Sequence, residues 1–598
     1  MSNQLTRLFL IDQSLETTGT HHADLLETLA LQAMRHRIDV RAGVNLEFPE
    51  SSSLSVPVKR CYANSTYQSV SRLAGLRRVK RNAMVKAQRR DTRFSWFKNW
   101  LTSRINAAES SRRDRLIVRF AQNTSSFFNE IEFEDSDHVL FLCVSELELL
   151  GAFRYLAQTP RTIQANWSFL FHFNVFTGNP ATFPAQARQL KDLCDDIHGS
   201  IRALPYHRLR FFATTDALVE QYQRLGISTV RAFSYPVPDS FDYTADFSKT
   251  NEMAGDRPFR FVVAGGVRRE KGQQANLREI LEGLCEIQRS GVEAELQIQR
   301  PKRPRWCPPK LDMPKECAEI SGVNMVDHPL PAAEYNRLIR ESDCGILLYD
   351  RENYAARRAG IFGEFASCAK PMIVSAGCWL SDQLETFQSA HVHNLICRHE
   401  GTLCEISNGS FEFCKSNVPL PGSVWSFDSS MHPFVARFDL DCTATSLLIE
   451  FEWHFRRAMG TYCQWELFHD DRLAGMPRIV GQGRKSPISR CIIPLNRKLR
   501  LKNCSLKLSN PYSDANLSIK GVRVFACPES LGELPISSAG LAIGHASEVP
   551  WAMREIVKHK GHYQKTAVAF AGDWLKRHAS SNALSEIIPP FQLKSKAA

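Results

Sequence analysis

Residues 259–272 read FRFVVAGGVRREKG, and this stretch decides the fold expected for the middle of the chain. The run 259–264 is mostly apolar, as in a buried strand, and two glycines then turn the chain. Arg268, Arg269 and Lys271 follow that turn. A strand that delivers cations at its end provides charge-assisted hydrogen bonds to phosphate. The stretch therefore predicts an α/β domain with a phosphate site at the edge of its sheet.

A second stretch, 354–364, reads YAARRAGIFGE and runs into an amphipathic helix, after which the chain enters the strand 372–375. A helix that starts at a glycine presents free backbone N–H groups, which bind phosphate. Glu364 lies four residues beyond Gly360 and can accept hydrogen bonds from ribose hydroxyls. Together the two stretches predict a ligand with a nucleotide and a diphosphate.

Strands and helices alternate in two series, which predicts two Rossmann-like domains with mostly parallel sheets. The first series occupies residues 1–240, and the polar stretch 239–257 is expected to be a linker. The predicted strands are 8–11, 139–144, 169–173, 211–215, 260–264, 294–299, 345–349 and 372–375, and the predicted helices are 23–35, 146–155, 216–225, 274–287, 332–340 and 379–387.

Between the second series and the C-terminal tail the pattern changes to short alternating runs separated by turn residues, which is typical of a β-sandwich. The predicted organisation is an N-terminal Rossmann-like domain, 1–240, on the acceptor side, with a basic insertion at 70–120. A C-terminal Rossmann-like domain, 241–390 plus 540–598, follows on the nucleotide-sugar side. An all-β sandwich, 405–530, is inserted into it.

The composition is that of a globular protein, with 43% hydrophobic and 23% charged residues among 598. No apolar run reaches the length of a membrane helix, and the first strand follows the N-terminus without a signal peptide, so a cytoplasmic location is expected. Seventeen cysteines without any C-x-x-C pattern indicate reduced thiols. His559 and His562 lack further nearby ligands, and no metal site is predicted.

The net charge of +12 is concentrated in residues 72–119, where fifteen Lys/Arg face three acids and aromatic residues lie among the cations. Such a segment suits an anionic membrane surface, which would make the protein peripheral at the inner face of the membrane. A solvated insertion is the alternative. No nucleic-acid module accompanies the segment, so no nucleic-acid partner is expected.

The order of these motifs resembles the GT-B glycosyltransferases, in particular the group-1, GT4-like branch. The resemblance rests on Gly-Gly-x-Arg-x-Glu-Lys-Gly at 265–272 and on Gly-Ile-Phe-Gly-Glu-Phe-Ala-x-x-Ala-Lys-Pro at 360–371. It covers about residues 1–390 and 540–598. It implies transfer of a sugar from a nucleotide-diphosphate donor, with no cofactor besides that donor substrate.

The resemblance also implies roles for individual residues. Lys271 matches the lysine that binds the donor diphosphate, and Glu364 matches the glutamate that binds the ribose. His172, after the predicted strand 169–173, matches more loosely a histidine near the donor sugar; a structural histidine is the alternative. The predicted catalytic residues are His172, Lys271 and Arg268, and the predicted nucleotide-sugar-binding residues are Gly19, Gly266, Arg268, Lys271, Gly360, Ile361, Phe362, Gly363 and Glu364.

Two positions depart from the family pattern. Gly266 stands where the family has an arginine, so Arg268 or Arg269 must replace it. Ala356 stands where the family has the first glutamate of its E-x7-E pair, and the usual contact to the donor sugar is therefore missing. Arg357 and Arg358 lie beside it and can supply further phosphate contacts.

The predicted function is hexosyl transfer to a hydroxyl of a glycan or lipid-linked glycan, without metal and, as the resemblance implies, with retention of anomeric configuration. Cations and amide dipoles then neutralise the departing diphosphate. The alternative is a non-catalytic nucleotide-sugar or glycan-binding protein, in which Ala356 marks lost turnover. A nucleotide-sugar epimerase shares the two-domain fold and would convert the donor without an acceptor.

Overall fold

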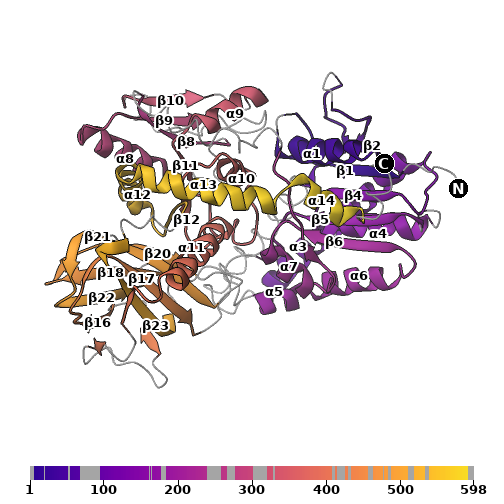
Figure 1. Ribbon diagram of the computed structural model, residues 1–598. Coiled ribbons are helices and arrows are strands. Elements are labelled where there is room, and N and C mark those ends of the chain that lie inside the picture. The colour runs from indigo at the N-terminus through magenta and orange to yellow at the C-terminus, as the bar shows by residue number, and fades with distance from the viewer. Residues whose placement is uncertain are drawn as a thin grey trace. The chain divides into compact units, whose positions relative to one another are not determined.

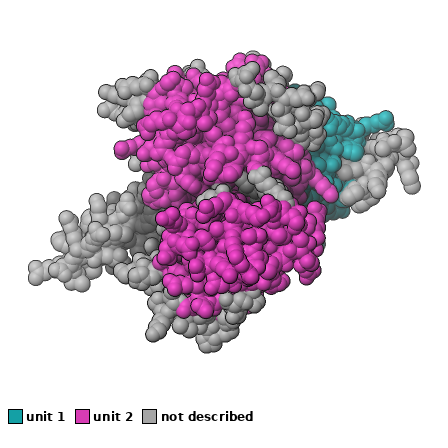
Figure 2. All heavy atoms as spheres, turned by 60° about the vertical axis from the view of Figure 1, so that its left-hand side comes forward, with its two compact units in different colours: residues 1–176, 184–239, 577–598 teal, residues 177–183, 240–576 magenta. Residues whose placement is uncertain are grey.

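The computed structural model describes residues 6–18, 20–50, 54–66, 95–159, 162, 164–176, 183–238, 257–265, 276–300, 320–326, 330–406, 411–413, 424–427, 433–454, 462–475, 477–481, 487–509, 517–531 and 538–589. The chain divides into two compact units (Figure 2). Unit 1 comprises Met1–Phe176, Pro184–Asp239 and Arg577–Ala598, and unit 2 comprises Thr177–Phe183 and Ser240–Lys576.

Unit 1 is built on a seven-stranded parallel sheet (Figure 1). Its strands, in spatial order, are β3 (Val58–Tyr62), β2 (Asp39–Asn45), β1 (Arg7–Asp12), β4 (His138–Val144), β5 (Asn166–Phe171), β6 (Arg208–Ala213) and β7 (Arg231–Ala232). The order 3-2-1-4-5-6 is that of dinucleotide-binding folds, in which the order reverses between the first and fourth strands. The predicted Rossmann-like architecture of the N-terminal part is confirmed.

The central strands of unit 1 are buried on both faces, which is why they read as continuous apolar runs. Every residue of β4 is buried. Phe141, Phe169 and Phe211 lie on three adjacent strands and stack at centroid distances of 5.1 and 5.7 Å. The helices are α1 (His21–Arg35), α3 (Ser95–Phe128), α4 (Glu146–Gln158), α5 (Phe183–Gln189), α6 (Lys191–Arg202), α7 (Asp216–Arg224) and α14 (Ser580–Ile587).

The end of the predicted basic insertion is part of the unit 1 fold. Helix α3 is the crossover from β3 to β4, and it packs on α4. Phe120, Phe127 and Phe128 are buried, and the Phe128 ring lies 5.8 Å from that of Phe9 on β1. This differs from the predicted insertion at 70–120, because the described C-terminal part of the helix buries apolar side chains in the core of unit 1. No described helix is long and apolar enough to cross a membrane.

Helix α14 also belongs to a different unit from the one predicted. The sequence assigns 540–598 as a whole to the C-terminal domain, whereas Arg577–Ala598 belong to unit 1. Ala583, Leu584 and Ile587 on α14 are buried in the same hydrophobic cluster as Leu25 and Leu29 on α1. Glu586 accepts hydrogen bonds from the Ser234 backbone and hydroxyl. The apolar stripe of α14 therefore completes the core of unit 1.

Unit 2 contains a second parallel sheet with the same type of strand order. Its strands, in spatial order, are β10 (Val323–Val326), β9 (Ala294–Gln299), β8 (Phe259–Val263), β11 (Cys344–Leu347), β12 (Met372–Ser375) and β24 (Gly540–Ile543). The helices are α8 (Leu277–Arg289), α9 (Ala332–Arg340), α10 (Gly360–Ser367), α11 (Trp379–Arg398), α12 (Val549–Lys558) and α13 (Lys560–Arg577). The order 3-2-1-4-5-6 confirms the second Rossmann-like part.

The chain returns to this sheet after the β-rich segment. β24 pairs in parallel with β12, with Met372 opposite Gly540 and Ser375 opposite Ile543. A Cβ atom at Gly540 would lie 2.1 Å from the Met372 carbonyl oxygen, so this contact requires glycine. Helix α12 packs against α8 on the same sheet.

Residues 404–527 form two antiparallel sheets. One contains β13 (Cys404–Ile406), β23 (Leu517–Cys527), β17 (Thr443–Trp453) and β21 (Ile488–Arg500), with β15 (Trp425–Phe427) paired to β23. The other contains β14 (Glu412–Phe413), β16 (Phe434–Phe438), β22 (Cys504–Ser509), β18 (Tyr462–His469) and β19 (Arg472–Leu473), with β20 (Arg478–Gly481) paired to β18.

The two antiparallel sheets share one hydrophobic cluster that includes Trp425, Trp465 and Phe451. Helix α11 lies between these sheets and the parallel sheet of unit 2 (Figure 1), where Val392, Leu395 and Ile396 pack on residues of β17, β21 and β23. The helix is longer than the predicted 379–387 because its second half has this partner.

Leu584→Ala tests whether α14 stabilises unit 1. The side chain is fully buried, so its truncation should cost about 2–5 kcal/mol. Hydrogen exchange followed by mass spectrometry should show faster exchange in α1 and β1 and unchanged exchange in β8. Ser581→Ala, at an exposed position of the same helix, is the control. Unchanged protection of α1 would contradict this packing.

Candidate functional site

The two sequence motifs of unit 2 follow two strands that are paired with each other. β8 and β11 are parallel neighbours, with Phe261 opposite Cys344 and Val262 opposite Gly345. β8 leads into Gly265, whose φ of 80° is the left-handed conformation that glycine adopts readily. β11 leads through residues 348–359 into α10. Between these strands the strand order reverses, and ligands of such sheets bind outside the carboxyl ends at that point.

The N-terminus of α10 has no side-chain cap. Its N-cap residue, Ala359, has extended backbone angles and makes no side-chain hydrogen bond, and no acidic residue lies in the first turn. The first N–H groups of a helix and its dipole favour an anion at this end. Gly360 and Gly363 keep side-chain bulk away from these groups.

Arg358 lies beside this helix start and is held by aromatic rings. Its guanidinium lies 5.9 Å from the Trp379 ring and 5.3 Å from the Trp574 ring. A Cβ atom at Gly363 would lie 3.1 Å from Arg358 Nη2, so the guanidinium packs directly on the first turn of α10. Arg357 lies 5.6 Å from the Tyr354 ring. Two cations therefore accompany the helix N-terminus.

Glu364 is buried, with 8% of its surface exposed. Tyr335 on α9 donates a hydrogen bond from Oη to Glu364 Oε2 at 2.5 Å. The phenol fixes one carboxylate oxygen, which orients the side chain. Tyr335 was not predicted as a site residue, because its link to Glu364 joins two helices and leaves no local signal in the sequence.

Gln299 is a second residue that sequence analysis missed. It ends β9, is 1% exposed, and accepts a hydrogen bond from the Gly265 N–H at 2.5 Å. Its Nε2 has no hydrogen-bond partner among the described residues. No sequence signal identified it, because β9 alternates apolar and polar residues and Gln299 follows Glu295 and Gln297 in that alternation. It holds the glycine turn against the neighbouring strand.

The other predicted positions are placed as follows. Phe362 is fully buried, with its ring against Trp379 and Trp574, so only its backbone could contact a ligand at the helix start. Ile361 is half-buried, and Ala356 is buried with 2% exposure. Gly19, Gly266, Arg268 and Lys271 lie outside the described residues.

Unit 1 has a cluster of polar side chains at the corresponding position of its own sheet, between β1 and β4, where the strand order reverses. This position is called the switch point of the sheet. Asp12 ends β1 and His22 lies in the first turn of α1, and Asp12 Oδ2 and His22 Nδ1 are 2.8 Å apart. Both are buried. His172 follows β5, and its ring stacks on His22 at 6.3 Å and meets Tyr235 edge-on at 5.7 Å. The predicted His172 thus lies in a cluster whose centre is His22.

The loop between β1 and α1 is fixed by a hydrogen-bond network. Gln13 Nε2 donates to Thr66 Oγ1 and to the Cys143 carbonyl, and Asn45 Nδ2 donates to the Gln13 carbonyl at 2.8 Å. The Ser14 N–H donates to Asp12 Oδ1 at 2.9 Å. Strands β1, β2 and β4 are therefore bonded together at their carboxyl ends, and Asp12 is held rigidly.

Asp12, His22 and Cys143 are the described residues whose ligand atoms come close enough to hold a metal ion, all within 4.8 Å of one another. Two ligands of one tetrahedral zinc lie about 3.4 Å apart, given bonds of about 2.1 Å. The 2.8 Å between Asp12 Oδ2 and His22 Nδ1 is instead a hydrogen-bond distance. The geometry is that of a carboxylate–imidazole pair.

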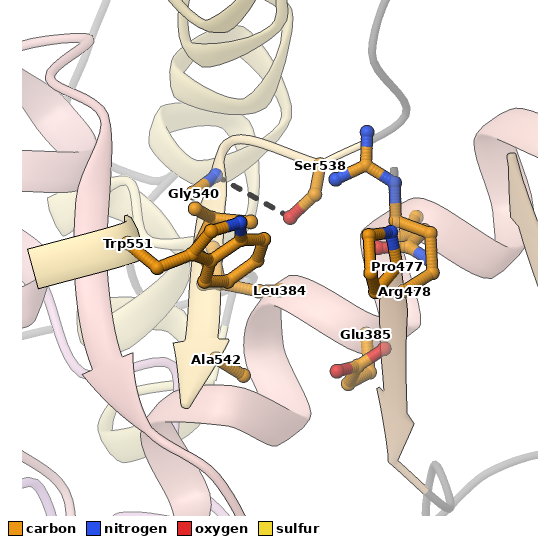
Figure 3. Close-up of a pocket in the computed structure, with 10 residues that line it drawn as sticks. Leu384, Glu385, Pro477, Arg478, Ser538, Gly540, Ala542 and Trp551 are labelled. Atoms are coloured by element: carbon orange, nitrogen blue, oxygen red, sulfur yellow. Dashed lines mark hydrogen bonds between the residues drawn. The ribbon is translucent and has the colours of Figure 1, made fainter. Parts of the chain in front are cut away.

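A small pocket elsewhere in unit 2 lies where α11 and β24 meet β20 (Figure 3). None of the predicted site residues lines it. Glu385, Arg478, Ser538 and Trp551 are among its lining residues. Burial raises the pKa of Glu385 to about 8, and Glu385 Oε2 has no hydrogen-bond partner among the described residues.

Each unit thus has a parallel sheet with the Rossmann-like strand order, and two such sheets are expected for the GT-B fold. No protein-family model matches the chain, and no curated protein matches it. Solved structures similar to it include a UDP-forming trehalose-phosphate synthase from Burkholderia xenovorans, at 12% identity and a TM-score of 0.39, covering 64% of this chain and 86% of that chain.

Two further solved structures are similar at the same level. Sucrose-phosphate synthase from Thermosynechococcus elongatus has 12% identity and a TM-score of 0.38, with 66% of this chain and 90% of that chain covered. The E. coli trehalose-6-phosphate enzyme bound with UDP-2-fluoro glucose has 10% identity and a TM-score of 0.39, with 63% and 86% covered. At this level of likeness the fold assignment rests on the strand orders of the two units.

Glu385→Gln tests the buried carboxyl. The pKa of Glu385 is about 8 in the folded protein against an ordinary 4.5, so the folded state favours the neutral form. The neutral Glu385 carboxyl contributes fully to the stability of the folded state below pH 4.5, and this contribution is lost as the pH rises to about 8. The glutamine variant should remove this loss and raise the thermal midpoint at pH 8.5 by a few degrees.

Thermal unfolding at pH 5.5 and 8.5 measures this difference. Glu400→Gln, which removes an exposed carboxylate just beyond α11, is the matched control. A glutamine variant of Glu385 with the same pH dependence as the wild type would contradict the assignment.

Proposed function

We propose that the chain is a glycosyltransferase that moves a sugar from a nucleotide-diphosphate donor to a hydroxyl of a glycan or lipid-linked glycan, without metal. One observation carries the proposal. Strands β8 and β11 are paired, and the strand order of the unit 2 sheet reverses between them. The glycine turn follows β8, and the uncapped helix α10 follows β11. Cations and free amides, which the sequence places 90 residues apart, thus start from adjacent strands.

In this proposal the donor diphosphate binds the N–H groups from Gly360 to Gly363 together with Lys271 and Arg268, and Glu364 binds the ribose. The buried position of Glu364 supports its role, because Tyr335 holds the carboxylate in one orientation through a hydrogen bond of 2.5 Å. Gly266 and Gly19 would let the backbone approach the phosphates closely.

The chemistry requires that negative charge on the leaving diphosphate be stabilised as the bond from the anomeric carbon breaks. Each charge-assisted hydrogen bond contributes about 1.5–3 kcal/mol. Three or four such contacts, made by amides and cations that are already in place, lower the barrier without a metal ion. The aromatic support of Arg358 keeps one cation beside the amides without rearrangement.

The finer expectations follow from the resemblance. They are a hexosyl donor, retention of anomeric configuration with the departing phosphate taking the acceptor proton, and unit 1 as the acceptor side. The anomeric proton coupling of the product, measured by NMR, determines the stereochemical outcome.

A non-catalytic nucleotide-sugar-binding protein is the second candidate, and Ala356 favours it. This residue is buried and has no group that can hydrogen-bond a sugar. Calorimetry with UDP-, GDP-, ADP- and dTDP-sugars, followed by turnover assays with glycan acceptors, separates the two. Binding with transfer supports the enzyme, binding without turnover supports the second candidate, and no binding by any of them removes both.

Lys271→Ala should weaken nucleotide-sugar binding at least tenfold, about 1.4 kcal/mol. The reason is the loss of a cation from the diphosphate. Calorimetric titration with the best donor measures it, and Lys565→Ala, at an exposed position of α13, is the control. An unchanged titration would contradict the phosphate site.

Glu364→Gln should weaken binding of the ribonucleotide roughly tenfold, because an amide accepts ribose hydroxyls less well than a carboxylate. The matching deoxyribonucleotide should lose much less. Glu334→Gln, at an exposed position of α9, is the control. Equal losses for ribose and deoxyribose would assign Glu364 to helix packing alone.

A further inference from the structure

We propose that the pocket between α11, β20, β24 and α12 of unit 2 binds a small carboxylate ion, which Arg478, Ser538 and Glu385 hold by donating hydrogen bonds. None of the described residues of the proposed nucleotide-sugar site lines this pocket. The inference therefore goes beyond the proposed function and does not depend on it.

Arg478 brings a buried positive charge to the wall of the pocket. The residue is 5% exposed, and its Nε donates a hydrogen bond to the Ile492 carbonyl at 2.9 Å. Its Nη2 is buried and has no hydrogen-bond partner among the described residues. A guanidinium stays charged in proteins, and a buried cation is costly unless acceptors or an anion meet it. The free end of Arg478 therefore indicates an acceptor oxygen that a bound molecule supplies.

Two further titratable groups lie near Arg478, and neither lines the pocket. Glu555 on α12 has its Oε1 3.1 Å from His559 Nε2, and burial raises its pKa while Arg478 opposes that rise. Tyr563 on α13 is a phenol whose pKa burial raises to about 12, so it is neutral at pH 7. Arg478 Nη2 hydrogen-bonds to neither of them.

Ser538 and Glu385 also offer hydrogens to a ligand. The Ser538 hydroxyl oxygen accepts the Gly540 N–H at 3.3 Å, so its own hydrogen is available to another acceptor (Figure 3). Glu385 is 7% exposed, and its Oε2 has no partner among the described residues. Burial raises the pKa of Glu385 to about 8 although the Gly481 N–H opposes the shift, so the carboxyl is neutral at pH 7 and can donate. A molecule that accepts from Arg478, Ser538 and Glu385 together is an anion.

The groups that face Glu385 keep its carboxyl neutral up to about pH 8. Asp382 on the same helix adds to the rise in the pKa of Glu385 by repulsion. Cys463 on β18 and Cys491 on β21 face it as well, and burial raises the pKa of both thiols, so neither is charged near neutral pH. Arg478 comes from β20, whereas β24 and α12 contribute no charged side chain to the pocket. Above pH 8 an ionised Glu385 would repel a bound carboxylate.

Size and charge favour a carboxylate of one or two carbon atoms. The cavity has a volume of about 20 Å³, and roughly 10–15 Å³ is enough for one water molecule, so an ion of a few atoms fills it. Arg478 supplies one positive charge, which one carboxylate balances, whereas a phosphate dianion would leave a negative charge buried. Leu384, Ala542 and Trp551 form an apolar wall on which a methyl group can pack.

The bound ion would connect the inserted sandwich to the parallel sheet within unit 2. Arg478 lies on a strand paired with the antiparallel sheet, Glu385 lies on α11, and Ser538 precedes β24 of the parallel sheet. An ion that accepts hydrogen bonds from all three residues stabilises the contact between these elements. Binding should therefore raise the thermal midpoint of the protein.

Thermal unfolding of the full chain measures the binding, with sodium formate or acetate added at pH 6.5 against sodium chloride of equal ionic strength. The carboxylates should raise the midpoint saturably, with a dissociation constant of about 0.1–10 mM, as expected for a ligand of three or four heavy atoms. Acetamide, which has the shape of acetate without its charge, should have no effect. Hydrogen exchange in saturating acetate should slow in β20, β24 and α11 and stay unchanged in β9.

Two results of this titration would overturn the proposal. One is an acetate response no larger than that of chloride. The other is a phosphate response that saturates at a lower concentration than that of acetate.

Arg478→Gln should weaken acetate binding at least tenfold, because the cation is lost. Arg497→Gln, at an exposed position of β21, is the control and should leave the affinity unchanged. Since loss of a buried arginine can itself disturb folding, Ala542→Val is a second variant, which keeps the cation and fills the cavity. It should abolish the acetate response. A wild-type response in either Arg478→Gln or Ala542→Val would show that acetate binds elsewhere.

Glu385→Gln tests the third donor through the pH dependence of binding. An amide N–H donates at any pH, so this variant should bind acetate equally well at pH 6.5 and 9. The wild type should lose about tenfold in affinity over the same interval, because its carboxyl ionises at about pH 8. An unchanged wild-type affinity would contradict the role of Glu385. No nucleotide sugar is present in these measurements, so their outcome is independent of the transferase proposal.

Discussion

The pairing of the first with the fourth strand of each parallel sheet is the constraint on which both sites depend. In unit 1 this pair is β1 with β4, and in unit 2 it is β8 with β11. The chain leaves these strands toward opposite sides of the sheet, so the loops that follow them diverge and leave backbone groups accessible between them. In unit 1, Asp12 and Gln13 lie at this point, and in unit 2, Gln299 at the end of the next strand bonds to Gly265 beside it.

The parallel sheets are buried on both faces, so the few polar residues at the ends of their strands must be held by hydrogen bonds. Asp12 and Gln13 end and follow β1, Gln299 ends β9, and all three have almost no exposed surface. A buried polar group costs free energy unless it has partners, so each of these side chains is tied to a neighbouring strand or helix. The bonds that satisfy them also hold the loops in place. The stability of the sheets and the rigidity of the sites therefore have the same origin.

Much of the fold could be predicted from sequence because the hydrophobic pattern is local. The strands 294–299 and 372–375 and the helix 332–340 have the predicted bounds. Helix α14 was assigned to the wrong unit, because its apolar stripe does not say which core it covers. Tyr335 and the pairing of Asp12 with His22 depend on contacts between elements, which no local pattern records. The motifs at Gly360 and Glu364 were found because a helix start is a local feature.

The substitution at Ala356 bears on the chemistry proposed for unit 2. A transferase has to stabilise a departing diphosphate and remove a proton from the acceptor. With a buried alanine in place of the first glutamate, the proposed function gives the leaving group the cations and the α10 amides of unit 2, and one buried carboxylate, Glu364, which accepts a hydrogen bond from Tyr335.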